Sequence, residues 1–163
     1  MKIAVLSDTH GNYPLAIQAL DRIADIDCII HLGDTIQDAE IIECALSLPI
    51  IKLAGNCDPS CDAPRELVLT IRDTIIYLTH GDLFQVKNDL EKICRKAASE
   101  NARIALYGHT HIPTIQKNGE ILLVNPGSLK KTDSHQSLAI LSIKDGEASA
   151  EIVAIANNEF PSP

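Results

Sequence analysis

Polar clusters that contain a glycine follow five runs of residues with the character of β-strands. The clusters are Asp8-Thr9-His10-Gly11, Gly33-Asp34, Gly55-Asn56-Cys57-Asp58, His80-Gly81 and Gly108-His109-Thr110-His111. They supply carboxylate, imidazole and amide groups, which together suit Mn²⁺, Fe²⁺ or Zn²⁺. Ca²⁺ takes only oxygen ligands and fits this mixture less well. Each cluster alone could be an ordinary turn, but five in order after strands predict a metal site.

The clusters contain more donor groups than one metal ion uses. A tetrahedral or octahedral ion takes four to about six ligands, so the set is large enough for two metals that share a carboxylate. Residues i and i+2 of an extended segment point to one side, so we expect Asp8 to face the same way as His10, and His109 the same way as His111. The candidate ligands are Asp8, His10, Asp34, Asn56, His80, His109 and His111.

Strands and helices alternate in the first third of the chain. Aliphatic runs at 3–6, 28–30 and 50–53 predict buried strands, and helical spacing predicts helices over 16–24, with Asn12 as N-cap, and over 38–47. Strand–helix alternation predicts parallel strands. Ligands of open α/β sheets bind beyond the carboxyl ends of the strands, which is where the polar clusters lie.

The rest of the chain is richer in hairpins. A helix with an apolar face from Val86 to Ala97 and a strand at 104–107 interrupt them. Two mixed sheets covered by helices, an αββα sandwich, would accommodate both halves, and a three-layer αβα sandwich would also do so. The expected hairpins join 67–71 to 74–78 through Arg72-Asp73, 112–115 to 121–124 through Asn118-Gly119, and 137–143 to 148–154 through Asp145-Gly146.

Composition restricts the class of protein. The length of 163 residues predicts one domain, residues 1–156, followed by a loosely ordered tail at 157–163. Only 3% of the residues are aromatic, so the core must be built from aliphatic side chains. The net charge of −8 argues against an extended nucleic-acid surface or binding to an anionic membrane.

Targeting signals are not evident. The chain contains no apolar run long enough to span a membrane and no secretory signal pattern. Its five cysteines form no Cys-x-x-Cys pair, which favours reduced thiols and a cytoplasmic location. His31 and His135 are interpreted as ordinary core or surface histidines.

In type and order, the five clusters resemble the motifs of the calcineurin-like metallophosphoesterases. The resemblance spans Asp8 to His111, most of the chain. Gly55-Asn56-Cys57-Asp58, the segment Asn125-Pro126-Gly127-Ser128 and the small size resemble the YfcE-type phosphodiesterase subfamily. The resemblance implies an α/β fold of four layers, the αββα sandwich, and so selects between the two architectures above.

The resemblance also implies a role for each ligand. One metal would be held by Asp8, His10, Asp34 and His111, and the second by Asp34, Asn56, His80 and His109, with Asp34 bridging. Mn²⁺ is the expected metal, with Ni²⁺, Fe²⁺ and Zn²⁺ as alternatives. A hydroxide bridging the two metals would attack phosphorus. Asp34, Asn56, Cys57 and His80 are the candidate catalytic residues, and Asn56, Cys57 and Ser128 the candidate substrate contacts.

Three departures from the wider family bear on specificity. Cys57 stands where many relatives have a histidine that can protonate the leaving group. A thiol is a weak donor. We therefore expect a preference for esters with acidic leaving groups, such as aryl phosphodiesters. Asp82 follows His80-Gly81 where many relatives have a second histidine, and lies either beside the site or outside it. Lys130 and Lys131 could reach a substrate phosphate or lie in solvent.

The leading hypothesis is a metal-dependent phosphodiesterase acting on a small substrate. The alternatives are a phosphomonoesterase for a small metabolite or phosphoprotein, and a non-catalytic protein-binding scaffold of the same fold. The hairpin-rich edges leave room for a homodimer or higher homo-oligomer. No base-binding or sugar-binding signature identifies the substrate.

Overall fold

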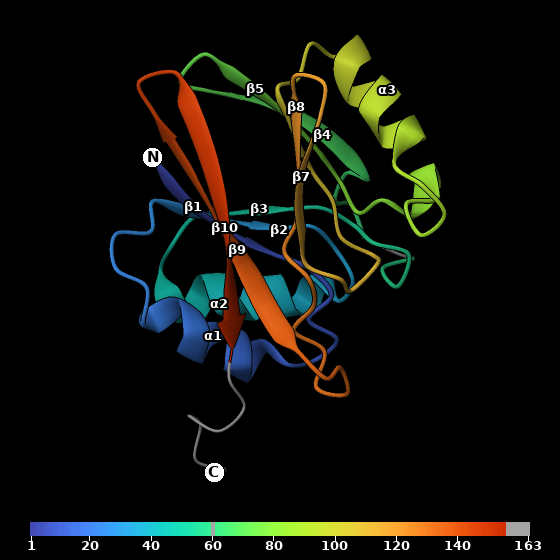
Figure 1. The fold of residues 1–163 in the computed structure, drawn as a ribbon. Coiled ribbons are helices and arrows are strands. Elements are labelled where there is room, and N and C mark those ends of the chain that lie inside the picture. The colour runs from blue at the N-terminus through green and yellow to red at the C-terminus, as the bar shows by residue number, and fades with distance from the viewer. Residues whose placement is uncertain (60, 156–163) are drawn as a thin grey trace.

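Two five-stranded sheets pack face to face, and helices cover their outer faces (Figure 1). The computed structural model describes residues 1–59 and 61–155. The four layers are the αββα sandwich that the resemblance implies. The expected tail, residues 157–163, lies outside the described residues. None of the described helices is long and apolar enough to cross a membrane.

The first sheet combines a parallel core with an antiparallel hairpin. As predicted from the strand–helix alternation, β1, β2 and β3 are parallel neighbours. The hairpin of β9 and β10 adds to β1 antiparallel. Across the sheet the order is β10 (Glu147–Ile155), β9 (Gln136–Lys144), β1 (Lys2–Leu6), β2 (Cys28–His31) and β3 (Ile50–Lys52).

The second sheet has the same construction with two hairpins. Its three central strands, β5, β6 and β8, are parallel, and β4 and β7 pair antiparallel at the two edges. The strand order is β4 (Glu66–Ile71), β5 (Thr74–Thr79), β6 (Ile104–Leu106), β8 (Ile121–Asn125) and β7 (Thr114–Asn118).

Alternation along each strand divides the core into three parts. Ile3 and Val5 of β1 face the interior between the two sheets, where Ile76 of β5 meets them. Leu6 points the other way, toward α1 (Tyr13–Asp21) and α2 (Ile36–Leu46). On the far face of the second sheet, Tyr77 packs with residues of α3 (Glu91–Ser99). Aliphatic side chains dominate all three parts, as the low aromatic content predicts.

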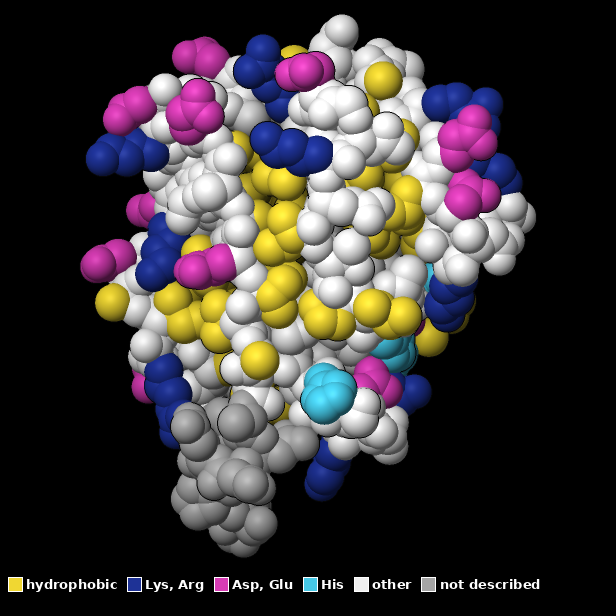
Figure 2. All heavy atoms as spheres, in the orientation of Figure 1, with side chains coloured by type: hydrophobic (Ala, Val, Ile, Leu, Met, Phe, Trp, Pro, Cys, Tyr) yellow, Lys and Arg dark blue, Asp and Glu magenta, His cyan; other side chains and the backbone are white. Residues whose placement is uncertain are grey.

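The face drawn in Figure 2 shows where the two sheets adjoin. Hydrophobic side chains form a band down its middle, over the region where the β9–β10 hairpin and β7 lie in Figure 1, and charged side chains gather toward its sides. The edge strands β10 and β7 contact one another. An oligomer formed through such edges stays a prediction.

Helix α1 ends, and helix α3 begins, inside the range that its apolar spacing predicts. Helix α1 ends at Asp21 although Ile23 continues the pattern, and Ile23 still packs on the core from the following turn. Helix α3 begins at Glu91, whereas Val86 is buried in the preceding segment, which includes a 3-10 turn at Asp82–Phe84. In both cases the apolar spacing indicates which residues are buried, but the helical backbone does not include all of them. Asn12 stands at the N-cap position but its side chain donates to the Leu129 carbonyl instead.

The hairpin turns agree with the sequence at two positions and differ at one. Arg72-Asp73 and Asp145-Gly146 join their strands as predicted, and both residues of the latter turn have positive φ, 52° and 81°. The third turn is displaced by one residue, because Asn118 pairs with Ile121 and leaves Gly119 and Glu120 as the turn.

Asp58 ties the loop after β3 to the start of α2 at the carboxyl end of the first sheet. Its Oδ1 accepts hydrogen bonds from the backbone N–H groups of Thr35 and Ile36, each 2.9 Å long. Its Oδ2 accepts from the N–H groups of Asp34 and Gly55, also at 2.9 Å. Thr35, at the N-cap position of α2, makes no side-chain cap. The Asp58 carboxylate therefore caps α2 from a distant point in the chain.

We expect Asp58→Asn to lower the free energy of unfolding by about 3 kcal/mol, because an amide nitrogen would face N–H donors that lose their charged acceptor. Urea unfolding in the presence of a chelator measures this without a contribution from metal binding. Asp62→Asn is the matched control, since Asp62 lies exposed in the same loop; a surface change of this kind costs less than about 0.5 kcal/mol. Equal losses in both variants would contradict the capping role.

Candidate metal centre

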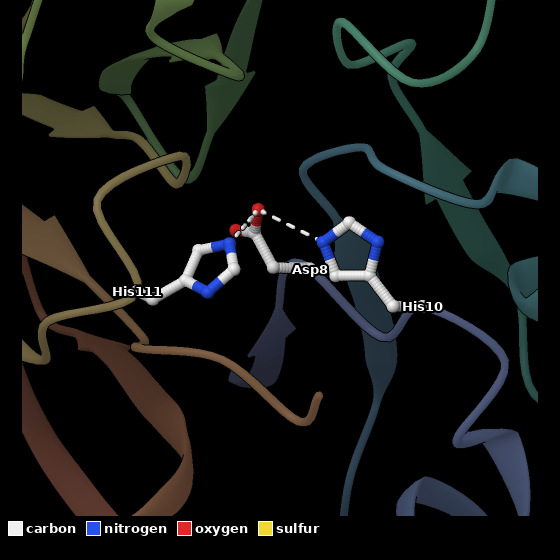
Figure 3. Close-up of side chains that lie close together, drawn as sticks. All are labelled: Asp8, His10 and His111. Carbon is white, nitrogen blue, oxygen red and sulfur yellow. Dashed lines mark ion pairs between the residues drawn. The ribbon is translucent and has the colours of Figure 1, made fainter. Parts of the chain in front are cut away.

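Asp8 follows β1 and is fully buried where the two sheets meet. Its Oδ2 accepts hydrogen bonds from Ser7 Oγ at 2.5 Å and from the backbone N–H of His109 at 3.0 Å. Its Oδ1 lies 3.1 Å from His111 Nε2 and 3.9 Å from His10 Nε2. Figure 3 shows this carboxylate between the two imidazoles, which come from the loops after β6 and β1.

Asp34 is the second buried carboxylate of the site, and only 2% of it is exposed. Its Oδ2 lies 3.6 Å from His10 Nε2, and its Oδ1 lies 3.5 Å from His80 Nε2. The backbone N–H of Cys57 donates to the same Oδ1 at 2.9 Å. Each oxygen of Asp34 thus faces a different imidazole.

His80 is fully buried and lies where several acceptor atoms meet. Its Nδ1 donates to the carbonyl of Leu32 at 3.0 Å, and this hydrogen bond turns Nε2 into the site. Nε2 lies 3.1 Å from Asn56 Oδ1, 3.5 Å from Asp34 Oδ1 and 3.2 Å from His109 Nδ1. A cation placed among these atoms would contact both oxygens and Nε2.

Unpaired buried atoms give a direct test of whether a metal fits. In residues 1–59 and 61–155, Asp8 Oδ1 and His10 Nε2 are buried without a hydrogen-bond partner. Burying such atoms is unfavourable unless a ligand pairs with them. Donor atoms within 4.8 Å of one another form three overlapping groups: Asp8, His10 and His111; Asp8, Asp34 and His80; and His10, Asp34 and Cys57. The donor set therefore fits a divalent metal.

The structure brings all of the sequence-predicted ligands into one continuous cluster. Asn56 and His109 join it through Nε2 of His80, and His109 lies outside the three tight groups. Cys57, predicted as a catalytic residue and substrate contact, is exposed at the edge of the cluster, and its sulfur belongs to one of those groups.

The backbone reason for this convergence differs from the one predicted. Alternation in an extended segment does not apply, because Asp8 and His10 have left-handed φ values of 54° and 45°. Asp34, His109 and His111 are also left-handed, at 63°, 67° and 62°. Non-glycine residues adopt this region at a cost of about 1–3 kcal/mol each when the surroundings impose it. The site is therefore held in place by its contacts rather than by strand geometry.

Two glycines are required by close approach of neighbouring groups. A Cβ on Gly108 would overlap Ser7 Oγ and lie 2.9 Å from Asp8 Oδ2. A Cβ on Gly55 would overlap Asp34 Oδ1. At both positions the absent side chain leaves room for the carboxylates that the site is built around.

The protein sets the ionisation of these groups through burial and hydrogen bonds. Burial alone would raise the pKa of Asp8, but the neighbouring imidazoles of His111 and His80 lower this pKa to about 2. The Asp8 carboxylate raises the pKa of His111 in turn. Burial, together with Asp34, raises the pKa of Cys57 to about 11, so its sulfur is a neutral thiol near pH 7.

Asp133 is a functional candidate that the sequence analysis missed. Its Oδ2 lies 2.8 Å from His111 Nδ1, so this nitrogen donates to the carboxylate and Nε2 is left free to face Asp8. Carboxylates in this position orient histidine ligands and increase their basicity. No motif surrounds Asp133, and only the proximity of its loop to His111 identifies it.

Three other residues hold the loops of the site. Asp82 Oδ2 accepts from Arg65 Nη2 at 2.5 Å, and Arg65 Nη1 donates to the Gly55 carbonyl at 3.0 Å, so this pair joins the loops after β5 and β3. Ser128 is fully buried and its hydroxyl donates to the Asp8 carbonyl at 3.1 Å. A substrate contact through the Ser128 side chain stays a prediction.

The remaining predicted positions lie apart from the metal ligands. His31 is a core histidine: burial lowers its pKa to about 4, and its ring contacts Thr9 Oγ1 at 3.1 Å. His135 is exposed. Lys130 is half-buried and Lys131 exposed. The interpretation of the two histidines as ordinary core or surface residues agrees with these positions.

We expect Asp133→Ala to weaken Zn²⁺ binding about 10- to 100-fold, because His111 loses the carboxylate that orients it. Calorimetric titration of the metal-free protein with Zn²⁺ measures this affinity. Asp133→Asn, which keeps an acceptor oxygen, should lose less. Asp62→Ala serves as the control, and the melting temperature of the metal-free Asp133→Ala variant should stay close to that of the wild type. Unchanged Zn²⁺ affinity would remove Asp133 from the site.

Comparison with known proteins places this geometry in a family. The family model of the calcineurin-like phosphoesterase superfamily domain matches residues 1–146. The probable metallophosphoesterase YsnB of Bacillus subtilis is 32% identical over 163 residues, which cover 98% of this chain and 95% of YsnB. The phosphodiesterase YfcE of Escherichia coli K12 is 30% identical over 154 residues, with 79% of each chain covered.

Solved structures agree with this assignment. A predicted phosphoesterase from Streptococcus pneumoniae matches with a TM-score of 0.79 and 30% identity over 93% of this chain and 88% of that one. Vps29 from Entamoeba histolytica, solved with Zn²⁺, matches with a TM-score of 0.76 over 94% and 99% of the two chains; its 21% identity shows a shared fold only. Together with the matched domain and the relatives, this means that the chain belongs to the calcineurin-like phosphoesterase superfamily.

Proposed function

We propose that the chain is a metal-dependent phosphodiesterase that hydrolyses small phosphodiesters at a dinuclear centre. The observation that carries the proposal is the pair of buried carboxylates, Asp8 and Asp34, each facing two imidazoles, with Asp8 Oδ1 and His10 Nε2 left unpaired. YfcE and a second relative, from Methanocaldococcus jannaschii, carry the name phosphodiesterase.

The ligands divide into two sets around Asp34. Asp8, His10, Asp34 and His111 would hold one metal, and Asp34, Asn56, His80 and His109 would hold the other. We propose Mn²⁺ as the metal, with Ni²⁺, Fe²⁺ and Zn²⁺ as alternatives. When bound, such a pair supplies hydroxide near neutral pH and neutralises charge on the phosphoryl oxygens.

The protein side chains orient this chemistry. Asp133 fixes the ring of His111, and the Leu32 carbonyl fixes the ring of His80, so that Nε2 of each histidine faces the site. The exposed side chains of Asn56 and Cys57 lie at the outer edge, where a phosphoryl group would arrive. Asn56 Nδ2 donates to Cys57 Sγ at 3.4 Å, which holds the two side chains together.

The neutral thiol of Cys57 limits the leaving groups that the site can handle. A thiol with a pKa of about 11 carries no positive charge and protonates a departing oxygen poorly. Esters of acidic alcohols and phenols need no such proton. The site therefore favours esters with acidic leaving groups, such as aryl phosphodiesters. At Cys57 it also lacks the positive charge that would bind the dianion of a phosphomonoester, whose hydrolysis is the alternative activity. Five unpaired cysteines support a cytoplasmic location as part of the proposal.

We expect the metal-free protein to leave bis-p-nitrophenyl phosphate intact and added Mn²⁺ to restore its hydrolysis, measured by release of p-nitrophenolate. Asn56→Ala should lower kcat at least about 100-fold, because it removes a metal ligand from an exposed position. Asn118→Ala, which changes an exposed asparagine at the β7–β8 turn, should leave kcat unchanged. Wild-type protein without turnover under any of the four metals would refute the phosphodiesterase and favour a scaffold.

We expect Cys57→His to raise the hydrolysis of p-nitrophenyl phosphate relative to the diester by about 10-fold or more, because an imidazolium can contact a dianionic phosphate and donate a proton. Cys57→Ser is the control, since a hydroxyl adds neither charge nor an acid. The ratio of kcat/KM for the two substrates is the measurement. Equal ratios in all three proteins would remove Cys57 from the mechanism.

A further inference from the structure

A hollow of about 320 Å³ lies beside the candidate metal centre. Val86 and Leu90, from the segment before α3, form one wall, and Tyr107, after β6, forms another. The opposite side is formed by the loop around Thr110 and by β7. The full lining is Val86, Lys87, Leu90, Tyr107, Thr110, Ile112, Thr114 and Gln116. Its volume is at the lower end of those of ligand pockets, so it accommodates one ring-sized group.

The hollow and the metal centre share one loop. Thr110 lines the hollow and stands between His109 and His111, two of the candidate ligands. Thr110 is fixed by Asn125, whose Nδ2 donates to Thr110 Oγ1 at 3.1 Å. Its position relative to the two histidines is therefore rigid, and a molecule held at the metals can extend over Thr110 into the hollow.

Ile112 is exposed at this hollow in a way that the fold does not require. With 65% of its surface accessible, it is the most exposed large hydrophobic residue of residues 1–59 and 61–155. It directly follows His111 in the chain. Because Ile112 lines the hollow, its accessible side chain is available to contact a ligand that occupies this space.

Lys87 is the cationic residue of the lining. It lines the same hollow as Thr110, which lies between His109 and His111 in the chain. An anionic phosphoryl group at the metals would meet this charge, while the carbon skeleton attached to it would meet Val86, Leu90 and Ile112. The hollow thus complements an amphipathic ester, charged at one end and apolar at the other.

We propose that this hollow is the subsite for an apolar, ring-sized ester substituent of the phosphodiester substrate, with Ile112 as its specificity-determining contact and Lys87 as a rim cation for the phosphoryl group. This inference rests on the proposed function and adds to it the class of substrate: a phosphodiester with at least one uncharged alkyl or aryl group.

Binding of two phosphonates tests the subsite without turnover. Phenylphosphonate and methylphosphonate share the anionic group and differ only in the apolar substituent. We expect Zn²⁺-loaded wild type to bind phenylphosphonate about 10-fold more tightly by calorimetry, from burial of the ring. Phenylphosphonate should also shift the amide NMR signals of Tyr107, Thr110 and Ile112, whereas methylphosphonate should not shift that of Tyr107.

Two variants separate the apolar contact from the charge. Ile112→Thr should reduce the ratio of the two affinities to about 3 or less, because the ring loses its aliphatic contact. Lys87→Gln should weaken both phosphonates equally and leave the ratio at its wild-type value. Ile41→Thr is the matched control, an exposed isoleucine on α2 whose change should alter neither affinity.

The outcomes distinguish this subsite from the proposed activity. Equal affinities for the two phosphonates in wild type, absence of binding by either, or a ratio that Ile112→Thr leaves unchanged would each overturn the subsite. If Ile112→Thr reduces the ratio of affinities as expected but no phosphoester is hydrolysed with any metal, the proposed activity is refuted and the proposed subsite is supported. A parallel series of p-nitrophenyl esters with methyl or phenyl as the second group should show the same preference in kcat/KM.

Discussion

The buried carboxylate of Asp8 is the contact on which the arrangement of the site depends. Asp8 leaves the end of β1 in the first sheet, and its Oδ2 accepts the backbone N–H of His109 from the loop after β6 in the second. A charged group buried at such a junction is stable only when most of its lone pairs are satisfied. Hydrogen bonds from Ser7 and His109 satisfy Oδ2, and Oδ1 remains available to a metal ion. One side chain therefore joins the two sheets and offers a candidate ligand.

Left-handed backbone at the ligands is the consequence of this construction. Five of the candidate ligands have positive φ, and none of them is a glycine. Such residues are stable only if tertiary contacts offset the local strain. Asp58 provides part of that offset, because its carboxylate fixes the N–H of Asp34 and the start of α2. Gly55 and Gly108 provide space, since any side chain there would displace a carboxylate. Rigidity at the site thus comes from groups that bind no metal.

These features explain what could be predicted from the sequence. Parallel strands and the residue types that follow them indicated the sheet edge and the donor groups, because strand ends and side-chain chemistry are local properties. The backbone at Asp8 and His10 could not be predicted, since its φ values are imposed by contacts with distant loops. The same holds for Asp133, which has no sequence signal and acts only through proximity to His111. The predicted start of α3 was wrong for the same reason. Val86 follows the apolar spacing of a helix, but it packs on the core from a turn that precedes α3.

The negative charge of the chain is compatible with an anionic substrate if the metal ions bind before the substrate does. A net charge of −8, with Asp8 and Asp34 buried in the site, would repel an anionic ester from the protein without metals. In the proposed dinuclear centre, two divalent ions would halve that net charge and concentrate positive charge at the two carboxylates. Lys87, which lines the hollow, adds one further positive charge beside them. The metals would then bind before the substrate, and the hollow would select among the anions that they attract.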